Sequence, residues 1–379
     1  MRFLRSKVTG KWQALVRRLH GIRAERVLVA IGLRRYLGWV ERVIPPSQNI
    51  FRQVREVAPD LALVTPAIFG LSPEADYQKA SQALGIPTAV LVASWDNLTM
   101  KGTFHVPPDW VVVWNQIQVR EAELYHHLRR DRVLPVGAPV FDDVFERHWL
   151  RERPEICARA GLDPARPYFL YAVSSKRMLG DETALVVKLI QQMCAVLGGA
   201  RVQLLVRPHP KNQQGWERFA AESVRIWPTP GFADTAAAKS DLYNSLYHSA
   251  GVVGLNTSMF LEAAILDRPG LTFYSRRSEE AGGEGCAVER HAQFLHFRYL
   301  LEGGFLETMA DAGECARTML AILEGQDNKR AARRDFVHQF LRPAGVEAPA
   351  HRVAADVLES IAAGEIHRRP PTPETLEAR

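Results

Sequence analysis

Cysteine is scarce in this chain of 379 residues, and its cysteines lie far apart. There are four, with no CxxC pair among them: Cys157, Cys194, Cys286 and Cys315. Disulfide frameworks and structural zinc sites need closer or paired spacings. The scatter argues against both and favours a reducing, cytoplasmic setting.

Long hydrophobic runs are missing as well. No apolar run reaches the roughly 20 residues that cross a bilayer. The N-terminal stretch MRFLRSKVTGKWQALVRRL also lacks the uninterrupted apolar core of a signal peptide. We therefore expect neither export nor a transmembrane anchor.

Positive charge is concentrated in this same N-terminal stretch. The chain has a net charge of +6, and eight Lys and Arg residues lie between Arg2 and Arg26, opposed there only by Glu25. Apolar residues recur among them at nearly helical spacing, from Leu4 to Leu19. A basic amphipathic helix suits peripheral contact with anionic lipids on the inner face of the cell membrane; a solvated helix packed on the first domain is the other interpretation. Nucleic acid is not an expected partner, because no RRM, zinc-finger or helix-turn-helix pattern accompanies the charge.

The remaining sequence has the balance of a globular protein, with 47% hydrophobic and 24% charged residues. Its length indicates two domains. Short β-branched runs alternate with helical patterns, which is typical of parallel sheets with crossover helices. The first half has expected strands at Arg26–Ile31, Leu61–Thr65, Thr88–Ala93, Trp110–Trp114 and Val133–Val136, and expected helices at Gln48–Val57, Asp76–Leu84 and Gln118–Leu128. The second half has expected strands at Tyr168–Val173, Gln203–Val206, Val224–Trp227, Gly251–Gly254 and Gly270–Phe273, and expected helices at Thr183–Leu197, Thr257–Leu266 and Ala312–Leu323.

The expected organisation is an α/β protein with two Rossmann-like parallel-sheet domains that face an interdomain cleft. A charged segment with three prolines, Phe145–Pro167, marks the boundary. We predict an N-terminal domain over 1–150, a C-terminal domain over 151–345, a helical segment over 346–366 that packs back on the first domain, and a disordered tail over 367–379. Ligands of such folds bind outside the carboxyl ends of the strands.

A proline-flanked histidine is the first candidate for chemistry. The strand ending at Val206 runs directly into Arg207-Pro208-His209-Pro210-Lys211. Proline fixes its own φ and restricts the residue before it, so His209 is presented on a stiff turn. The cationic neighbours Arg207 and Lys211 suit a phosphate there, whereas a surface loop with incidental charges is the alternative.

A capped helix is the second candidate. The strand ending at Gly254 is followed by Asn256, Thr257 and Ser258, all good N-cap residues. A helix start with free N–H groups and hydroxyls binds phosphate. Glu262 follows Ser258 by one helical turn and suits ribose hydroxyls; an ordinary core helix with Glu262 in solvent is the alternative.

Two further segments follow expected strands. In Ser94–Gly102, Asp96 is the best placed carboxylate to act as a general base on an acceptor hydroxyl, with Trp95, Asn97 and Lys101 on the acceptor side. A turn capped by Asp96 and Asn97 is the other interpretation. Ser174, Ser175 and Lys176 follow the first strand of the second domain and suit the donor phosphate. His296 is interpreted as a core histidine.

Together these motifs resemble the GT-B glycosyltransferase superfamily. The RPHP turn, the strand followed by Asn256-Thr257-Ser258 and Glu262, and the stretches SWDNLTMKG and FDDVF carry the resemblance, which spans roughly residues 60–363. The nearest branch contains CDP-glycerol glycerophosphotransferases, bacterial polysialyltransferases and capsule-polysaccharide transferases. The resemblance implies that His209, Thr257 and Ser258 hold the nucleotide and its phosphates and that Glu262 holds ribose.

The resemblance implies a glycosyltransferase that moves a sugar from a nucleotide-sugar donor to a hydroxyl of a glycan or lipid-linked acceptor, in bacterial surface or secondary glycan synthesis. The branch typically has Asp-Tyr-Ser-Ser where this chain has Leu255–Ser258, which favours a donor other than glycerol phosphate. No DxD motif is present, in agreement with a fold that usually works without a metal or other cofactor. A single base on the opposite domain favours inversion. The alternatives are a CDP-glycerol-type polyol-phosphate transferase, a nucleotide-sugar 2-epimerase and a non-catalytic GT-B-like binding protein.

Overall fold

A computed structural model of the chain describes residues 36, 39–41, 43–68, 73–175, 181–199, 201–228, 231–274 and 294–366. The predicted strand at residues 26–31, the basic N-terminal segment and the predicted tail lie outside these residues. Among the described residues, no helix combines the length and the apolar character needed to cross a membrane.

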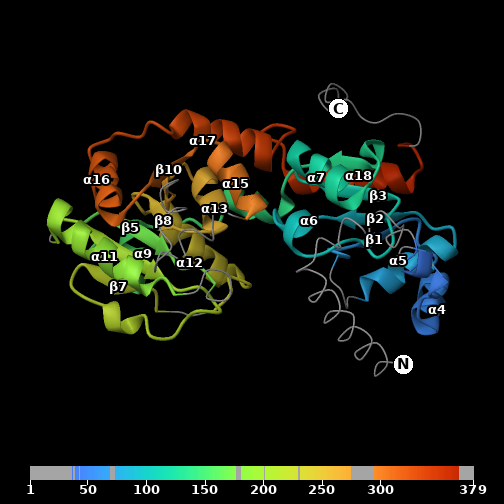
Figure 1. Ribbon diagram of the computed structural model, residues 1–379, viewed down its shortest axis with the longest axis horizontal. Coiled ribbons are helices and arrows are strands. Elements are labelled where there is room, and N and C mark those ends of the chain that lie inside the picture. The colour runs from blue at the N-terminus through green and yellow to red at the C-terminus, as the bar shows by residue number, and fades with distance from the viewer. Residues whose placement is uncertain are drawn as a thin grey trace, which may run out of the picture.

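Two parallel sheets organise the described chain and form two lobes (Figure 1). The first sheet has the order β1-β2-β3-β4, and neighbouring strands pair in parallel. Its strands are β1 (Ala62–Val64), β2 (Thr88–Leu91), β3 (Trp110–Val113) and β4 (Val133–Pro135). The second has the order β10-β9-β8-β5-β6-β7, also parallel throughout. Its strands are β5 (Tyr168–Ala172), β6 (Gln203–Arg207), β7 (Val224–Ile226), β8 (Val252–Gly254), β9 (Gly270–Phe273) and β10 (Leu306–Met309). The predicted fold class is confirmed.

The helices match most of the predicted segments within a few residues. Those of the first lobe are α4 (Gln48–Val57), α5 (Glu74–Ala83), α6 (Asn97–Met100), α7 (Gln116–His126) and α18 (Ala350–Ala362). Those of the second lobe and its connections are α8 (Asp142–Glu146), α9 (Arg153–Ala160), α11 (Thr183–Met193), α12 (Ala236–Tyr247), α13 (Met259–Ile265), α15 (Leu295–Glu302), α16 (Ala312–Leu323) and α17 (Arg330–Phe336). The predicted helix 183–197 is α11 followed by a π-helical turn, Cys194–Gly198.

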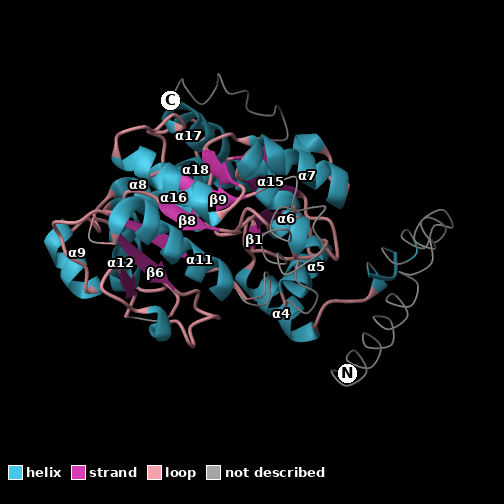
Figure 2. Ribbon diagram, turned by 60° about the vertical axis from the view of Figure 1, so that its left-hand side comes forward, coloured by secondary structure: helices cyan, strands magenta, loops and turns pink. Residues whose placement is uncertain are grey.

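The strands β3 and β5 are buried at every position because helices cover both faces of each sheet (Figure 2). In β5, alternate side chains enter different clusters: Leu170 packs on the side of α9, α12 and α13, and Phe169 on the side of α11 and α16. In the first lobe, Val111 of β3 packs with α7, whereas Val112 packs with Val353 and Val357 of α18. The last of the described helices, α18, therefore covers one face of the first sheet.

A buried ion pair holds the point where the chain passes between the lobes. Asp142 accepts hydrogen bonds from Arg342 Nη2 at 2.5 Å and from the backbone N–H groups of Ala350 and His351 at 3.1 and 2.7 Å. Both side chains of the pair are nearly inaccessible. The Asp142 carboxylate thus joins the segment in which the chain leaves the first lobe to the segment in which it returns.

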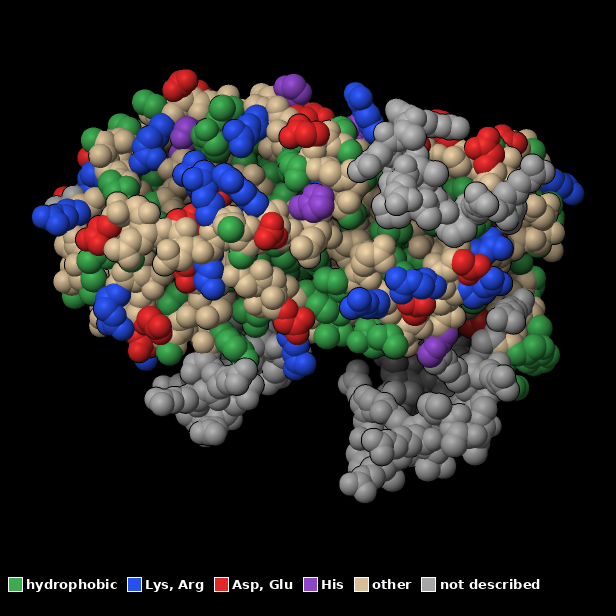
Figure 3. All heavy atoms as spheres, turned by 90° about the horizontal axis from the view of Figure 1, so that it is seen from above, with side chains coloured by type: hydrophobic (Ala, Val, Ile, Leu, Met, Phe, Trp, Pro, Cys, Tyr) green, Lys and Arg blue, Asp and Glu red, His purple; other side chains and the backbone are tan. Residues whose placement is uncertain are grey.

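Lys, Arg, Asp and Glu side chains are interspersed over both lobes on the face seen from above (Figure 3). Many are paired across elements, as in Lys239 with Asp143 at 2.6 Å.

Candidate active site

The strand order of the second sheet indicates one edge as the candidate ligand site. β5 comes first along the chain, yet it lies between β6 on one side and β8 on the other. In open α/β sheets, ligands bind outside the carboxyl ends of the strands at such a reversal of strand order. Ser174 follows β5, and Asn256 follows β8. A Cβ on Gly254 would lie 3.0 Å from the carbonyl oxygen of Ala172, so glycine allows the two strand ends to approach closely.

The His209 turn follows the adjacent strand end, that of β6. His209 Nδ1 accepts a hydrogen bond from the backbone N–H of Lys211 at 2.9 Å. The neutral imidazole therefore carries its proton on Nε2 and can donate it to a ligand. Burial, and then the charge of Lys211, lower the pKa of His209. The turn thus holds a neutral donor rather than a fixed cation.

The two cations beside His209 lie in different surroundings. Arg207 stacks on Trp227, with its guanidinium carbon 4.5 Å from the ring centroid, and Nη1 lies 3.4 Å from Ser245 Oγ. Its pKa is lowered to about 10, mainly by burial. Lys211 is exposed. Arg207 is therefore engaged within its own lobe, while Lys211 remains accessible on the turn.

Ser174 connects the end of β5 to the histidine turn. Its carbonyl oxygen accepts a hydrogen bond from Asn212 Nδ2 at 3.2 Å, and its N–H donates to Glu182 Oε1 at 2.8 Å. Its hydroxyl is buried and opposes the rise in the pKa of the nearby Glu182, and it makes no hydrogen bond of normal geometry within the described part of the chain. Ser175 is half-buried, and Lys176 lies outside the described residues.

The segment after β8 combines the start of α13, where the N-cap residue Ser258 makes no side-chain capping hydrogen bond, with a buried carboxyl group. Thr257 Oγ1 accepts the N–H of Met259 at 3.2 Å, and Ser258 is exposed, so α13 begins two residues later than predicted. Glu262 is 8% exposed, which contradicts the alternative that placed it in solvent. Burial raises its pKa to about 8. Its Oε2 has no hydrogen-bond partner among the residues described here, so a ligand hydroxyl would satisfy it.

The first lobe contributes a carboxylate held from two sides. Asp96 Oδ1 accepts a hydrogen bond from Ser94 Oγ at 2.7 Å, and Oδ2 lies 2.9 Å from Lys101 Nζ. The side chain is 16% exposed. Asn97 serves the backbone instead, because its Oδ1 accepts the N–H groups of Ala93 and Ser94 at 3.1 and 3.0 Å. Asp96 and Lys101 thus offer a proton acceptor and a cation, whereas Asn97 shapes the loop.

His296 joins the two groups of predicted residues. Its ring meets Trp95 of the first lobe edge-on, with centroids 4.7 Å apart and an interplanar angle of 85°. Its Nε2 lies 3.3 Å from Asn256 Nδ2 of the second lobe. The side chain is 1% exposed, and burial lowers its pKa to about 4. The sequence interpretation as a core histidine gave its burial but missed this bridging position between the loops that carry Asp96 and Thr257.

Glu121 of α7 adds a second carboxyl group at the same lobe boundary, and the sequence interpretation missed it. It is buried, and burial raises its pKa to about 7; the Tyr299 hydroxyl opposes the rise and Asp96 adds to it. Tyr299 lies three residues after His296, hence on the same face of α15. The sequence signal was this spacing of two polar rings in a helix that also presents Phe297 and Leu300 to the core.

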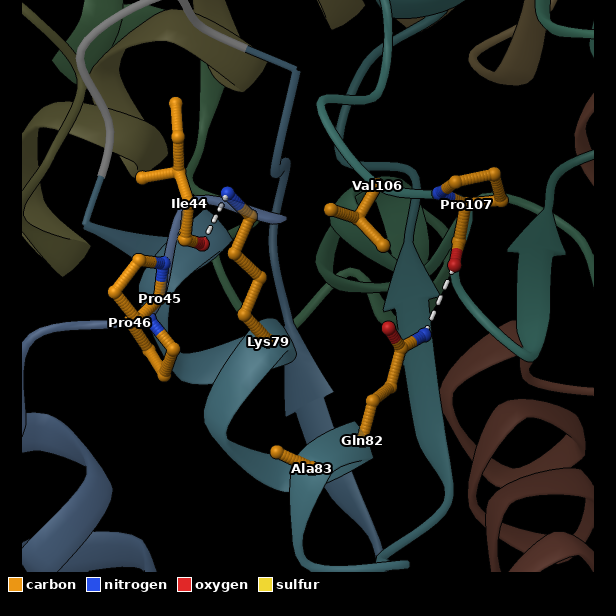
Figure 4. A pocket seen from close by; sticks show the side chains of 8 residues that line it. All are labelled: Ile44, Pro45, Pro46, Lys79, Gln82, Ala83, Val106 and Pro107. Atoms are coloured by element: carbon orange, nitrogen blue, oxygen red, sulfur yellow. Dashed lines mark hydrogen bonds between the residues drawn. The ribbon is translucent and has the colours of Figure 1, made fainter. Parts of the chain in front are cut away.

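A pocket of about 430 Å³ lies elsewhere, near the amino end of β2 (Figure 4). Gln82 in its wall donates hydrogen bonds to the carbonyl oxygen of Pro107 at 2.9 Å and to Thr88 Oγ1 at 3.3 Å. The residues around it are Ile44, Pro45, Pro46, Lys79, Gln82, Ala83, Val106 and Pro107. None of the predicted site residues lines this pocket.

No protein-family model and no curated protein matches the chain. Solved structures do resemble it. A Listeria monocytogenes protein assigned as a UDP-N-acetylglucosamine 2-epimerase has a TM-score of 0.55 at 11% identity, covering 85% of this chain and 79% of that one. S. aureus MnaA in complex with UDP has a TM-score of 0.53 at 10% identity, covering 89% and 84%. The wall teichoic acid polymerase TagF has a TM-score of 0.46 at 12% identity, covering 86% and 88%. At these identities the likeness concerns the fold, which is of the GT-B type.

Proposed function

We propose that this protein is a glycosyltransferase that moves a sugar from a nucleotide-sugar to a hydroxyl group of a glycan or lipid-linked acceptor. Residues 151–345 would bind the donor, residues 1–150 the acceptor, and the helix in 346–366 would complete the first lobe. The contact chain from Asn256 through His296 to Trp95 carries the proposal, because it connects the loop after β8 with the loop that holds Asp96.

On the donor side, the diphosphate would lie at the reversal of strand order. His209 Nε2–H, the hydroxyls of Ser174, Thr257 and Ser258, and backbone N–H groups would stabilise the charge that develops as the bond between the sugar and the phosphate breaks. Ser175 and Lys211 would add polar contacts at the same edge, and Lys176, outside the described residues, stays a sequence-based candidate for the donor phosphate. Glu262 would accept a hydrogen bond from a ribose hydroxyl, which supplies the partner that its buried Oε2 needs.

On the acceptor side, Asp96 would take the proton of the attacking hydroxyl. The acceptor oxygen forms its bond to the anomeric carbon as the nucleoside diphosphate leaves from the opposite side, so the configuration inverts. Lys101 would keep the carboxylate oriented through its 2.9 Å contact, and the ring contact with His296 would hold Trp95 in place beside it.

Turnover of nucleotide-sugars tests this proposal. The purified protein is incubated with UDP-, GDP-, CDP- and dTDP-sugars and a panel of glycan and lipid-linked acceptors, and nucleoside diphosphate release is measured. We expect Asp96→Asn to reduce transfer by about 10²-fold or more, as for loss of a general base, with nucleotide affinity retained. Asp131→Asn is the control, because Asp131 is an exposed carboxylate paired with Arg129. Wild-type protein that binds no nucleotide-sugar would contradict the proposal.

A nucleotide-sugar 2-epimerase is the second candidate, favoured by Glu121. A carboxyl group with a pKa of about 7 beside Asp96 can give and take a proton at neutral pH, and epimerisation needs such exchange. Epimerisation at carbon 2 breaks and reforms a C–H bond without an acceptor. Incubation in D₂O therefore distinguishes the two reactions: epimerisation places deuterium at carbon 2 of the recovered nucleotide-sugar, and glycosyl transfer leaves that carbon unlabelled.

A further inference from the structure

Glu182, at the start of α11, is a buried carboxyl group to which neither proposed reaction assigns a role. It is 1% exposed. Its Oε1 accepts the backbone N–H of Ser174 at 2.8 Å, and its Oε2 accepts the hydroxyl of Tyr171 at 2.9 Å. Placing a carboxyl group in the interior is costly unless its oxygens are satisfied. Here one of the two bonds goes to the loop that follows β5.

The same loop is tied to the histidine turn from its other side. The carbonyl oxygen of Ser174 accepts Asn212 Nδ2 at 3.2 Å, and the N–H of Asn212 donates to the carbonyl oxygen of His209 at 2.7 Å. A continuous path of hydrogen bonds thus runs from Glu182 through Ser174 and Asn212 to His209. The path spans the carboxyl ends of two neighbouring strands, β5 and β6.

Other bonds keep both ends of this path rigid. The N–H of Val173 donates to the carbonyl oxygen of Arg207 at 3.1 Å, and Trp216 Nε1 donates to the carbonyl oxygen of Asn212 at 2.9 Å. The loop would still lose its anchor if Glu182 were removed, because the N–H of Ser174 would then be left unsatisfied in the interior.

We propose that Glu182 is a positioning residue for the donor phosphates: it fixes the loop of Ser174 and, through Asn212, the turn of His209, so that the Ser174 hydroxyl and His209 Nε2 meet one diphosphate at a set separation. This assignment rests on the proposed binding of a nucleotide-sugar by the second lobe. The role proposed for Glu182 is to set the geometry of phosphate binding, and it involves no proton transfer.

Two substitutions of Glu182 distinguish a role in positioning the phosphate-binding groups from a general contribution to the stability of the fold. In Glu182→Gln, the amide oxygen still accepts from Ser174 and the amide nitrogen can donate to the Tyr171 hydroxyl oxygen. In Glu182→Ala, both bonds are lost. Glu314→Ala is the matched control, because Glu314 Oε2 accepts the backbone N–H of Ala310 at 2.7 Å in the same lobe, outside the path to His209.

The readout is the dissociation constant for UDP, GDP, CDP and dTDP, measured by calorimetry on each folded variant together with its melting temperature. For the nucleotide that wild type binds best, we expect Glu182→Ala to weaken binding on the order of tenfold, the usual effect of removing a residue that orients a ligand-binding group. Glu182→Gln should restore affinity to within about threefold. Glu314→Ala should lower the melting temperature without changing affinity.

Asn212→Ala provides a second route should Glu182→Ala not fold. It breaks the same path at the next step, and we expect a comparable loss of affinity. If wild type binds a nucleotide and both Glu182→Ala and Asn212→Ala bind it as tightly, the positioning role is wrong while the proposed function stands. If wild type binds none of the four nucleotides, the proposed function fails and the positioning role fails with it.

Discussion

At the scale of one residue, Glu262 is a buried carboxyl group that lowers the stability of the fold and that we propose as a ligand for ribose. Its carboxyl group is 8% exposed, and no hydrogen-bond partner for Oε2 is found among the described residues. Burial raises its pKa from 4.5 to about 8. Between these two pH values the folded state binds more protons than the unfolded state, so the free energy of unfolding falls as the pH rises. Below about pH 4.5 the group is protonated in both states and the penalty vanishes.

Glu262→Gln removes this penalty. We expect the variant to exceed wild type in free energy of unfolding by roughly 2–4 kcal/mol at pH 9 and by nothing measurable at pH 4. Urea denaturation at both pH values measures the difference. An increase in the free energy of unfolding that is equal at pH 4 and pH 9 would show that the ionisation of Glu262 does not cause it. The same variant should bind nucleotide more weakly at pH 9, where wild type offers ribose a carboxylate and the variant offers an amide.

At the scale of elements, the strands that could be predicted are those whose sequence is apolar without interruption. Tyr168–Ala172 and Trp110–Val113 are buried at every position, and their runs of apolar residues made them recognisable. β10 was missed because Glu307 and Thr308 interrupt its short sequence. The helix α12, AAAKSDLYNSLY, was missed because it combines small and polar residues with few large apolar ones.

The candidate site could be predicted only in part, for a related reason. Each predicted site segment comes directly after a strand in the sequence. Its place at the carboxyl edge of a sheet could therefore be predicted from the strand alone. His296 and Glu121 become significant through contacts between residues more than a hundred positions apart, such as His296 with Trp95. The amino-acid pattern of α15 contains no signal for the partner it meets.

His296→Ala tests the role of α15 as the link between the lobes. Loss of the ring removes the contacts to Trp95 and Asn256, so the loops that carry Asp96 and Thr257 lose their common support. We expect kcat to fall by about 10–100-fold, as for a small misplacement of reacting groups, while the dissociation constant for the nucleotide changes little. Glu302→Ala is the control, because Glu302 is the exposed last residue of the same helix. An unchanged kcat would rule out this linking role.

At the scale of the whole molecule, the crossing between the lobes depends on Asp142. Burial raises the pKa of this carboxyl group, but the hydrogen bonds from the His351 backbone, Arg342 and Ala350 lower it more, so the net shift is downward. A lowered pKa stabilises the fold above its ordinary value of 3.8, and this contribution is lost as the pH falls through the lowered pKa.

Asp142→Asn should therefore destabilise the protein, because Arg342 is left as a buried cation without its carboxylate. We expect a loss of about 3 kcal/mol in the free energy of unfolding at pH 7, and a smaller loss below pH 4. Asp143→Asn removes the exposed pair with Lys239 next in the chain and should cost less than about 1 kcal/mol. Equal losses in the two variants, measured by urea denaturation, would show that Asp142 does not hold the crossing.

The central claim is that a nucleotide diphosphate binds at the carboxyl ends of β5, β6 and β8, opposite Asp96. A crystal structure of the protein with the nucleoside diphosphate that it binds most tightly tests this directly. We predict phosphate oxygens within hydrogen-bond distance of His209 Nε2 and of Ser174 or Thr257, with ribose near Glu262. A diphosphate seated elsewhere, for example in the pocket around Ile44 and Pro107, would contradict the claim.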